Sequence, residues 1–382
     1  MPSEVVGRMN AVVDIKKGLE GVVVDSTSIS LVDGEAGRLY YRGHPIEKLV
    51  KNPFAAVAHL VVFGELPDAP RLREFEEFLW DAGRLPPELA AALERLAQLG
   101  GHPMATLQAA MPLMAFAPPT RAFGRTDDEQ QALVVAARLS TAHAMLVALR
   151  AGRAPTDYPQ TRRYGERFLQ LIHARPPTAL QVRILEQTQI LQIDHSFNAS
   201  TFTARVVTST LAPPASALAA AMGSLYGPLH GAADQGALEM AQEVGDPERA
   251  ADFVAGALSS GRLVMGMGHR EYRVVDPRSR IVKALAEEIA STPDEKRLIE
   301  TLKAVDEAFV AQTAHKKRSL RANLEFYKGV VYLALGLPKE FFTATFAAAR
   351  IFGWSAHIVE QRKDNRIVRP SANYIGPAPQ PD

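Results

Sequence analysis

The sequence predicts an all-α protein with one short β-hairpin near the N-terminus. Beyond residue 52, apolar residues recur at helical spacing, and capping residues, prolines and glycines mark where segments begin and end. The connections between these segments are short. Only the first fifty residues are rich in valine, isoleucine, threonine and tyrosine, in the run GVVVDSTSISLVDGEAGRLYYRG, which favours strands. These observations place a single β element at the start of a helical chain.

The predicted elements begin with the hairpin, which turns at residues 33–37, where the sequence DGEAG favours a tight turn. The first helix has Asn52 and Pro53 at its start and Gly64 at its end. Asparagine caps helices, proline fits the first helical position, and glycine ends helices. By the same signals, a second helix lies within about residues 87–100.

Capping motifs predict the later helices. The sequence TDDE at residues 126–129 is a capping box, and the apolar helical pattern behind it runs to Leu149. Asp246 and Pro247 open another helix in the same way. Further helices are expected at about residues 179–194, 214–222, 231–244, 281–291, 294–313 and 340–361.

Composition excludes several classes of protein. The length of 382 residues suits about two domains or one large domain. A net charge of +1 offers no global attraction to nucleic acid or to an anionic membrane, so neither is expected as a partner. The absence of cysteine rules out disulfides, thiolate metal sites and cysteine nucleophiles. No continuous apolar run approaches the roughly 20 residues of a membrane span, and no signal sequence is visible, so a cytoplasmic location is expected.

Common cofactor and hydrolase motifs are missing from the sequence. The patterns GxxxxGK[ST], HExxH, GxSxG and the EF-hand loop do not occur, which argues against phosphate-loop, zinc-protease, serine-hydrolase and calcium sites. The segment GMGHRE lacks the third glycine of a dinucleotide-binding fingerprint. We therefore expect neither a metal nor a resident cofactor.

Three histidines lie in settings that suit chemistry. His230 lies in GPLHG and His269 in GMGHREYR, each in a glycine-punctuated loop, and His195 ends a helix in DHSFNAS. Such loops bring backbone donors and an imidazole to one ligand, and imidazole acts as acid, base or neutral donor near pH 7. Taken singly, each histidine also fits a structural role, and that role is the more common one.

Four arginines and one glutamate add to this pattern: Arg273, Arg278, Arg350, Arg369 and Glu325. A guanidinium group suits bidentate binding of carboxylate or phosphate, although a single arginine more often forms a structural ion pair. Glu325 has apolar and aromatic neighbours in NLEFYKG, a setting that can raise a carboxyl pKa towards base chemistry; the alternative is a buried ion pair. From these residues alone, a metal-free acid/base enzyme acting on an anion is one option among several.

Around these residues the sequence resembles the citrate synthase family, from Gly18 to Gly376. The resemblance is carried by an ordered series of segments, of which each is moderately specific and the series very specific. The segments are GLEGVVVDSTSISLVDGEAGRLYYRG, DHSFNASTFTARV, GPLHGAA, MGMGHREYRVVDPR, NLEFYKGVVYLALGLP, FFTATFAAARIFGWSAHIVEQ and RIVRPSANYIG.

The resemblance implies an all-α homodimer in which each subunit has two domains. A large domain comprises residues 1–231 and 337–382, and a small helical domain, residues 232–336, is inserted in it and closes over the site. The resemblance also implies condensation of oxaloacetate with acetyl-CoA, followed by hydrolysis of the citryl thioester to citrate and CoA. The motifs do not separate this activity from that of a 2-methylcitrate synthase, which uses propionyl-CoA.

The resemblance also implies a role for each site residue. Three residues are implied to be catalytic. His230 donates a hydrogen bond to the thioester oxygen as that oxygen becomes enolate-like, and Glu325 is the catalytic base. His269 polarises the oxaloacetate ketone and protonates the new alkoxide. The oxaloacetate carboxylates are held by His195, Arg278 and Arg350, and Arg369 reaches the neighbouring subunit's site. CoA is contacted by Arg273 and by the loop of Gly266, Met267 and Gly268.

Two segments of the chain depart from the family pattern. The family's base is an aspartate in a motif similar to NVDFYSG, whereas this chain has Glu325, with Leu324 and Lys328 beside it; Asp234 stands where asparagine is usual. If the backbone lies where the family places it, the extra methylene moves the carboxylate by about 1 Å, and Glu325→Asp is expected to raise turnover. If Leu324, Lys328 and the preceding Arg321-Ala322 have instead reset the loop to suit glutamate, the same change lowers turnover; the first outcome is the one expected. The same departure motivates a rival hypothesis, a catalytically weak or silent paralogue that binds dicarboxylate or CoA as a sensor.

Overall fold

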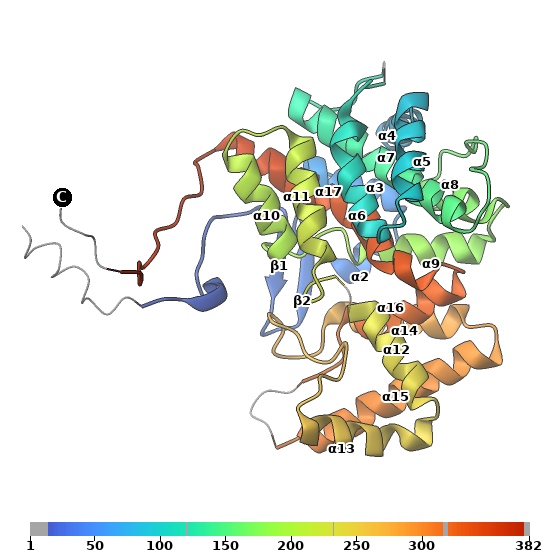
Figure 1. Ribbon diagram of the computed structural model, residues 1–382, viewed down its shortest axis with the longest axis vertical. Helices are drawn as coiled ribbons and strands as arrows, with labels where there is room; N and C mark the ends of the chain where they lie inside the picture. The colour runs from blue at the N-terminus through green and yellow to red at the C-terminus, as the bar shows by residue number, and fades with distance from the viewer. Residues whose placement is uncertain (1–13, 120, 232, 316–319, 378–382) are drawn as a thin grey trace, which may run out of the picture.

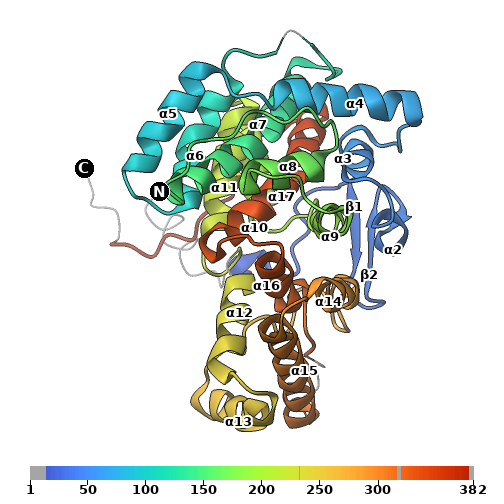
Figure 2. The ribbon, with the colours of Figure 1, turned by 90° about the vertical axis from the view of Figure 1, so that its right-hand side faces the viewer.

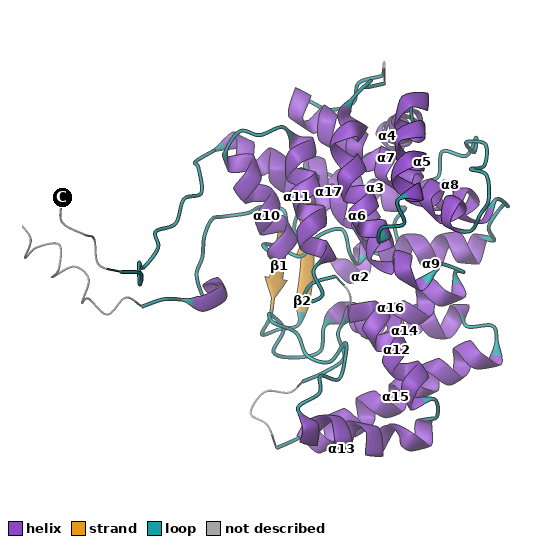
Figure 3. Ribbon diagram, in the orientation of Figure 1, coloured by secondary structure: helices purple, strands orange, loops and turns teal. Residues whose placement is uncertain are grey.

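The computed structural model describes residues 14–119, 121–231, 233–315 and 320–377. It is predominantly helical with one small antiparallel sheet, which confirms the predicted fold class (Figure 3). The strands are β1 (Ser30–Asp33), β2 (Arg38–Tyr41) and β3 (His44–Pro45), in the order β1-β2-β3. The predicted hairpin is confirmed as β1 and β2, and the two-residue β3 extends it to three strands.

The helices and short 3₁₀ turns follow the sheet in chain order. The first set is α2 (Ile46–Leu49), α3 (Phe54–Phe63), α4 (Ala69–Ala82), α5 (Pro87–Gln98), α6 (Pro103–Ala110), η2 (Met111–Ala115), α7 (Asp127–Arg150), α8 (Tyr164–His173), α9 (Ala179–Ile190), α10 (Ala199–Ser209) and α11 (Pro214–Tyr226). The second set is α12 (Ala233–Val244), η3 (Pro247–Arg249), α13 (Ala250–Ser260), α14 (Pro277–Ile289), α15 (Pro293–Thr313), α16 (Leu324–Ala334), η4 (Lys339–Phe341) and α17 (Phe342–Lys363).

The helices form a large body with a smaller group attached at one end (Figures 1 and 2). Helices α12, α13 and α15 lie at the end of the molecule opposite α4–α8, and α14 and α16 lie between them and the body. The predicted small domain, residues 232–336, contains α12 to α16, and its division from the large domain stays a prediction, with residue 232 itself outside the described residues. Residues 14–27 and 364–377 leave the body on the same side (Figure 1).

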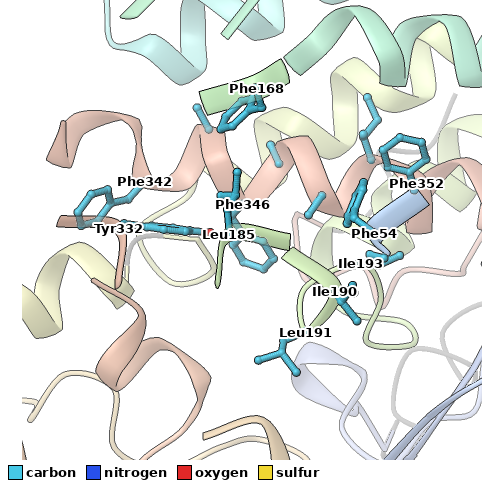
Figure 4. Close-up of a cluster of buried hydrophobic side chains, with 14 of the residues drawn as sticks. Phe54, Phe168, Leu185, Ile190, Leu191, Ile193, Tyr332, Phe342, Phe346 and Phe352 are labelled. Carbon is cyan, nitrogen blue, oxygen red and sulfur yellow. The ribbon is translucent and has the colours of Figure 1, made fainter. Parts of the chain in front are cut away.

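The core is built around α17, which packs against α3, α7, α10 and α11. Figure 4 shows Phe346 and Phe352 of α17 among Phe54, Leu185 and Ile190 from other helices. A helix that is apolar on all sides is normally buried, and α17 is buried along almost its entire length. This central helix is also the element that carries Arg350 into the interior.

Helix α7 changes one expectation from the sequence. By length and composition, Asp127–Arg150 is apolar enough to cross a membrane, although no continuous apolar run in the sequence has that length. Isolated polar residues such as Arg138 and His143 interrupt the apolar sequence of α7. They lower the mean hydropathy of the helix only slightly, so the helix is apolar on average although it contains no long continuous apolar run. In the structure, 94% of the most apolar stretch of this helix is buried inside the protein. The apolar composition of α7 is therefore that of a core helix.

Helix boundaries agree with the capping signals to within a few residues. Pro53, not Asn52, is the N-cap of α3, and α14 begins at Pro277, four residues before the predicted start. At the start of α7, the Thr126 side chain accepts from the backbone N–H of Glu129 at 3.2 Å. The Glu129 carboxylate accepts from the N–H of Arg125 rather than that of Thr126, so the capping box is only half formed. Helices α4, α6, α8, α10 and α16 were not among the predicted elements.

One buried histidine makes stability sensitive to acid. His143 lies between the rings of Phe168 and Phe341, and neither ring nitrogen has a hydrogen-bond partner among the described residues. Burial lowers its pKa to about 3. Because this pKa lies below the value of about 6.5 in an unfolded chain, the neutral ring's contribution is present above pH 6.5 and is lost as the pH falls towards 3.

We therefore expect the free energy of unfolding to fall between pH 6.5 and pH 4.5, with His143 contributing up to about 2–3 kcal/mol of the loss. Urea denaturation of the wild type and of His143→Phe at both pH values measures this contribution, since phenylalanine fills similar space without titrating. A smaller pH dependence is expected in the variant. Equal pH dependence in the two proteins would contradict the assignment.

Candidate active site

The structure brings the three singled-out histidines together where the small helical group meets the body. His195 follows α9, His230 lies between α11 and α12, and His269 lies in the loop before α14. The rings of His195 and His269 have centroids 5.0 Å apart. Arg350 of α17 is close enough to both His195 and His230 to lower their pKa values electrostatically. Residues distant in sequence therefore form one polar cluster.

Tyr272 joins His195 and His269 into a packed group. Its hydroxyl lies 3.3 Å from Nε2 of His195, and its ring centroid lies 4.7 Å from that of His269. His195 is buried, and burial together with the positive charges of Arg278 and Arg350 holds its pKa well below the usual value. His195 is therefore neutral near pH 7. A neutral imidazole can donate one hydrogen bond to a bound anion without carrying a charge itself.

A buried ion pair fixes the orientation of Arg278. Its Nε and Nη2 donate to the two oxygens of Asp276, at 3.0 and 2.8 Å. Nη2 also lies 3.4 Å from Nε2 of His269. Asp276 in turn accepts from the backbone N–H of Leu324 at 3.1 Å, which ties the start of α14 to the start of α16. Arg278 is thus a preoriented cation beside His269.

The glycine loop before His269 is attached to the start of α16. Met267 pairs with Ala322 in an antiparallel bridge, and the N–H of Gly268 donates to the Arg321 carbonyl at 2.7 Å. The Asn323 backbone N–H donates to Gly266, and its side chain donates to the Gly268 carbonyl, both at 2.9 Å. Gly266 has φ +77°, and a Cβ there would lie 2.9 Å from the Phe326 Cα. The loop that carries His269 is therefore fixed to the start of the helix that carries Glu325.

His230 is held as a neutral donor. The Ser200 backbone N–H lies 3.3 Å from its Nε2, and the Ser200 hydroxyl lies 2.9 Å from the same atom. Trp354 donates its indole N–H to that hydroxyl at 3.1 Å. Because Nε2 accepts from a backbone N–H, the ring proton resides on Nδ1. Burial and the charge of Arg350 lower the pKa of His230 to about 4, so Nδ1–H is a neutral donor at pH 7.

Arg350 is a buried cation with unused donors. Its Nε donates to the Gln192 carbonyl at 2.6 Å, and no carboxylate among the described residues lies within ion-pair distance of its guanidinium. Burial lowers its pKa to about 10, so it stays charged at neutral pH. An unpaired buried cation is costly. A bound carboxylate would compensate it.

Glu325 lies in the first turn of α16, and its side chain is 16% exposed. It forms an ion pair with Lys328 one turn later, and Lys328 also lies 3.3 Å from Asp234. For Glu325 the sequence allowed two roles, a catalytic base or a member of a buried ion pair. The structure contains that ion pair beside the histidine cluster. A carboxylate can accept a proton from such a position, so the two descriptions are compatible.

Taken together, the cluster offers neutral donors, two guanidinium groups and one partly exposed carboxylate. Comparison with known proteins identifies the family of the chain. A family described as citrate synthase, C-terminal domain, matches residues 18–371. The chain belongs to the citrate synthase family.

Relatives within this family cover nearly the whole chain. The chain is 34% identical to the 2-methylcitrate synthase of Shewanella oneidensis over 95% of both chains. It is 33% identical to the citrate synthase of Deinococcus radiodurans, over 95% of this chain and 96% of that one. The citrate synthase of Thermoplasma acidophilum, solved with carboxymethyl coenzyme A and oxaloacetate, superposes with a TM-score of 0.88 at 28% identity, covering 97% of this chain and 98% of that one.

Two residues that the citrate synthase resemblance assigns to substrate binding lie outside the cluster. Arg273 is 48% exposed, with its Nε 3.9 Å from a Glu35 oxygen. Arg369 is exposed on the C-terminal segment that leaves the body (Figure 1). Within one chain the structure therefore unites the histidines, Arg278, Arg350 and Glu325, but not these two arginines. Their roles, and that of the Gly266–Gly268 loop towards CoA, stay predictions.

Sequence reasoning missed several polar members of the cluster. Tyr272 and Asp276 lie within GHREYRVVDPR, beside residues that were singled out. Their nearness to His269 and Arg278 in sequence was a usable signal. Gln192, which contacts Arg350 and Lys328, lies two residues before Asp194 and had no such signal.

Proposed function

We propose that this chain condenses oxaloacetate with a short-chain acyl-CoA, acetyl-CoA or propionyl-CoA, and hydrolyses the resulting thioester to citrate or 2-methylcitrate and CoA. The observation that carries this proposal is the convergence of a neutral donor, His230, a carboxylate, Glu325, and the buried cation Arg350 on one site. Deprotonating a thioester beside an anionic keto acid needs this set: a base, an oxyanion donor and carboxylate binders.

In the proposed reaction, Glu325 removes a proton from the carbon next to the thioester carbonyl. The Nδ1–H of His230 stabilises the enolate oxygen that forms. The enolate carbon then attacks the keto carbon of oxaloacetate, and His269 delivers a proton to the alkoxide that this attack creates. Water finally cleaves the thioester, which releases the carboxylate product and the CoA thiol. Preoriented donors are most effective when water is excluded from such a site.

The oxaloacetate carboxylates are assigned to Arg350, Arg278 and His195. Arg350 has free guanidinium donors and no carboxylate partner among the described residues, whereas Arg278 already shares two hydrogen bonds with Asp276. Arg350 is therefore the main electrostatic partner, and Arg278 contributes its remaining donors beside His269. The proposal uses no metal and no cofactor other than the CoA thioester itself.

Arg350→Lys is expected to raise the dissociation constant for oxaloacetate roughly ten- to hundredfold, because lysine keeps the charge but loses the guanidinium fork. Calorimetric titration without acyl-CoA measures the affinity directly. Arg297→Lys serves as a control, since Arg297 is exposed on α15 and pairs with Asp246. Unchanged affinity in Arg350→Lys would contradict the assignment.

Release of CoA thiol, dependent on oxaloacetate, tests the proposed function. Purified protein is assayed with acetyl-CoA, propionyl-CoA and butyryl-CoA in parallel, with oxaloacetate omitted as the control. Similarity to both citrate synthases and 2-methylcitrate synthases supports turnover with at least one of the first two. The sensor hypothesis predicts binding of both ligands without thiol release, and that result would overturn the proposal.

We propose further that the protein is a homodimer whose C-terminal segment serves the partner's site. Residues 364–377 extend away from their own body and carry exposed apolar side chains, Ile367, Tyr374 and Ile375, together with Arg369 (Figure 1). Exposed apolar residues on an extended segment favour contact with a second chain. Light scattering at micromolar concentration is expected to give the mass of a dimer. A fully active monomer would contradict this proposal.

A further inference from the structure

Three charged side chains lie in contact with one another beside the site: Glu325, Lys328 and Asp234. Lys328 and Asp234 are completely buried, whereas Glu325 is 16% exposed. Of the three side chains, only Glu325 is therefore accessible to a substrate. A lysine at a fully buried position is unusual and needs compensating partners, since an isolated buried ammonium is strongly destabilising.

The Lys328 ammonium lies close to three oxygen atoms from other side chains, two in ion pairs and one in a hydrogen bond. These are an oxygen of Glu325, Oδ2 of Asp234 at 3.3 Å, and Oε1 of Gln192 at 3.0 Å. The Tyr332 hydroxyl lies 3.2 Å from the same Gln192 oxygen, and the ammonium lies 4.2 Å from the Phe346 ring centroid. The ammonium is thus held from several sides.

The charged and titratable groups around Lys328 come from three helices. Asp234 belongs to α12, Glu325 and Tyr332 to α16, and Arg350 to α17, where its guanidinium carbon lies 4.6 Å from the Phe346 ring centroid. Gln192, after α9, is neutral. Burial raises the pKa of Asp234 to about 6 although Lys328 opposes the shift. When Asp234 is ionised, the charges of Glu325, Lys328 and Asp234 sum to −1, the charge of one carboxylate.

We infer that Lys328, balanced by Asp234, is a positioning residue that anchors one oxygen of Glu325 and leaves the other oriented to accept a proton. The inference rests on the proposed function, in which Glu325 is the base. Lys328 lies one turn after Glu325 on the same helix, so the ion pair draws the glutamate side chain back along α16. This anchoring offsets the extra length of glutamate relative to aspartate. It also fixes the carboxylate without adding net positive charge to its surroundings, because the charge of Asp234 cancels that of Lys328.

Opposite pH effects are expected when either partner is removed. Lys328→Met leaves two carboxylates close together without a cation, which favours binding of a proton, so the acid limb of kcat/KM moves to higher pH by about one to three units. Asp234→Asn leaves Lys328 uncompensated against Glu325, so the acid limb moves to lower pH and turnover falls, because a base beside an unbalanced cation accepts a proton less readily. The double variant, Lys328→Met with Asp234→Asn, removes both charges and is expected to bring the acid limb back towards that of the wild type.

The experiment measures kcat and KM against pH for the wild type, the two single variants and the double variant, with circular dichroism to check folding. Lys303→Met is the control, because Lys303 pairs with Glu300 at the same spacing on α15, away from the site. Opposite shifts in the single variants and recovery in the double variant support the inference. If Lys328→Met does not fold, the inference is tested by the acid limb of Asp234→Asn, which is expected to move to lower pH, and by that of the double variant, which is expected to return towards the wild-type position.

An unchanged acid limb in an active Asp234→Asn variant, or a double variant whose acid limb stays displaced from that of the wild type, would overturn the inference and leave the proposed function standing. A purely structural role would lower the amount of folded enzyme without moving the acid limb. Failure of the proposed function is separate, since it would appear as absence of oxaloacetate-dependent thiol release in the wild type itself.

Discussion

His230→Ala and His269→Ala are each expected to lower turnover by about 100-fold or more, because each removes a donor aimed at charge that develops during the reaction. His230 is neutral, with its Nδ1 proton set by the Ser200 backbone N–H at Nε2. His269 lies beside Arg278, in a loop that is hydrogen-bonded to the start of α16. Both donors are held by the surrounding protein and need little reorganisation when the oxyanion forms.

Steady-state kinetics at saturating oxaloacetate measures the loss, and His44→Ala, at an exposed histidine in β3, serves as the control. A larger effect on kcat than on KM is expected, since the charge that these donors stabilise exists only after proton transfer has begun. Near-normal turnover in both variants would mean that the histidine cluster is not the catalytic site.

The second large effect is expected at Glu325. Glu325→Gln preserves the size of the side chain but removes the base, and a loss of about 100- to 10,000-fold in kcat is expected. The ion pair with Lys328 also changes the expectation for Glu325→Asp. The sequence favoured faster turnover in that variant on the assumption of an unadapted pocket. In the structure Lys328 anchors the longer side chain, so shortening it breaks the ion pair and misplaces the carboxylate.

We therefore expect Glu325→Asp to lower turnover by about tenfold or more, since a misplacement of about 1 Å can cost 100-fold. The two variants are compared under the same conditions, at saturating oxaloacetate and with both acetyl-CoA and propionyl-CoA. Faster turnover in Glu325→Asp would restore the unadapted-pocket hypothesis. Turnover of Glu325→Gln near that of the wild type would exclude Glu325 as the base.

The fold was largely predictable because its signals are local. Helix starts such as Thr126 and helix ends such as Gly64 depend on residues within one turn of each other, and the structure has helices at both places. Prediction was incomplete for α4, α6, α8, α10 and α16, and of these only α16 carries a candidate site residue, Glu325. Helix α16, for example, begins with Leu324 in the NLEFYKG segment. Its apolar face packs on α12 and α14, and that packing is a tertiary property.

The candidate site was predictable residue by residue but not as a set of contacts. The resemblance assigned His195, His230 and His269, and the structure brings them into one cluster. The link from Asp276 to the backbone of Leu324 spans 48 residues and has no local signature. Lys328 appeared only as a departure from a family pattern, because lysine is normally exposed. Its full burial depends on Asp234 and Gln192, which come from other parts of the chain.

The central claim is that this chain joins oxaloacetate to the acyl group of a CoA thioester. Mass spectrometry of the products formed by the purified wild-type protein, from oxaloacetate with acetyl-CoA and separately with propionyl-CoA, tests it most directly. We expect citrate or 2-methylcitrate, with one free CoA for each product molecule, and no product when oxaloacetate is left out. Unchanged substrates after prolonged incubation with both thioesters, in protein that binds oxaloacetate and CoA, would contradict it.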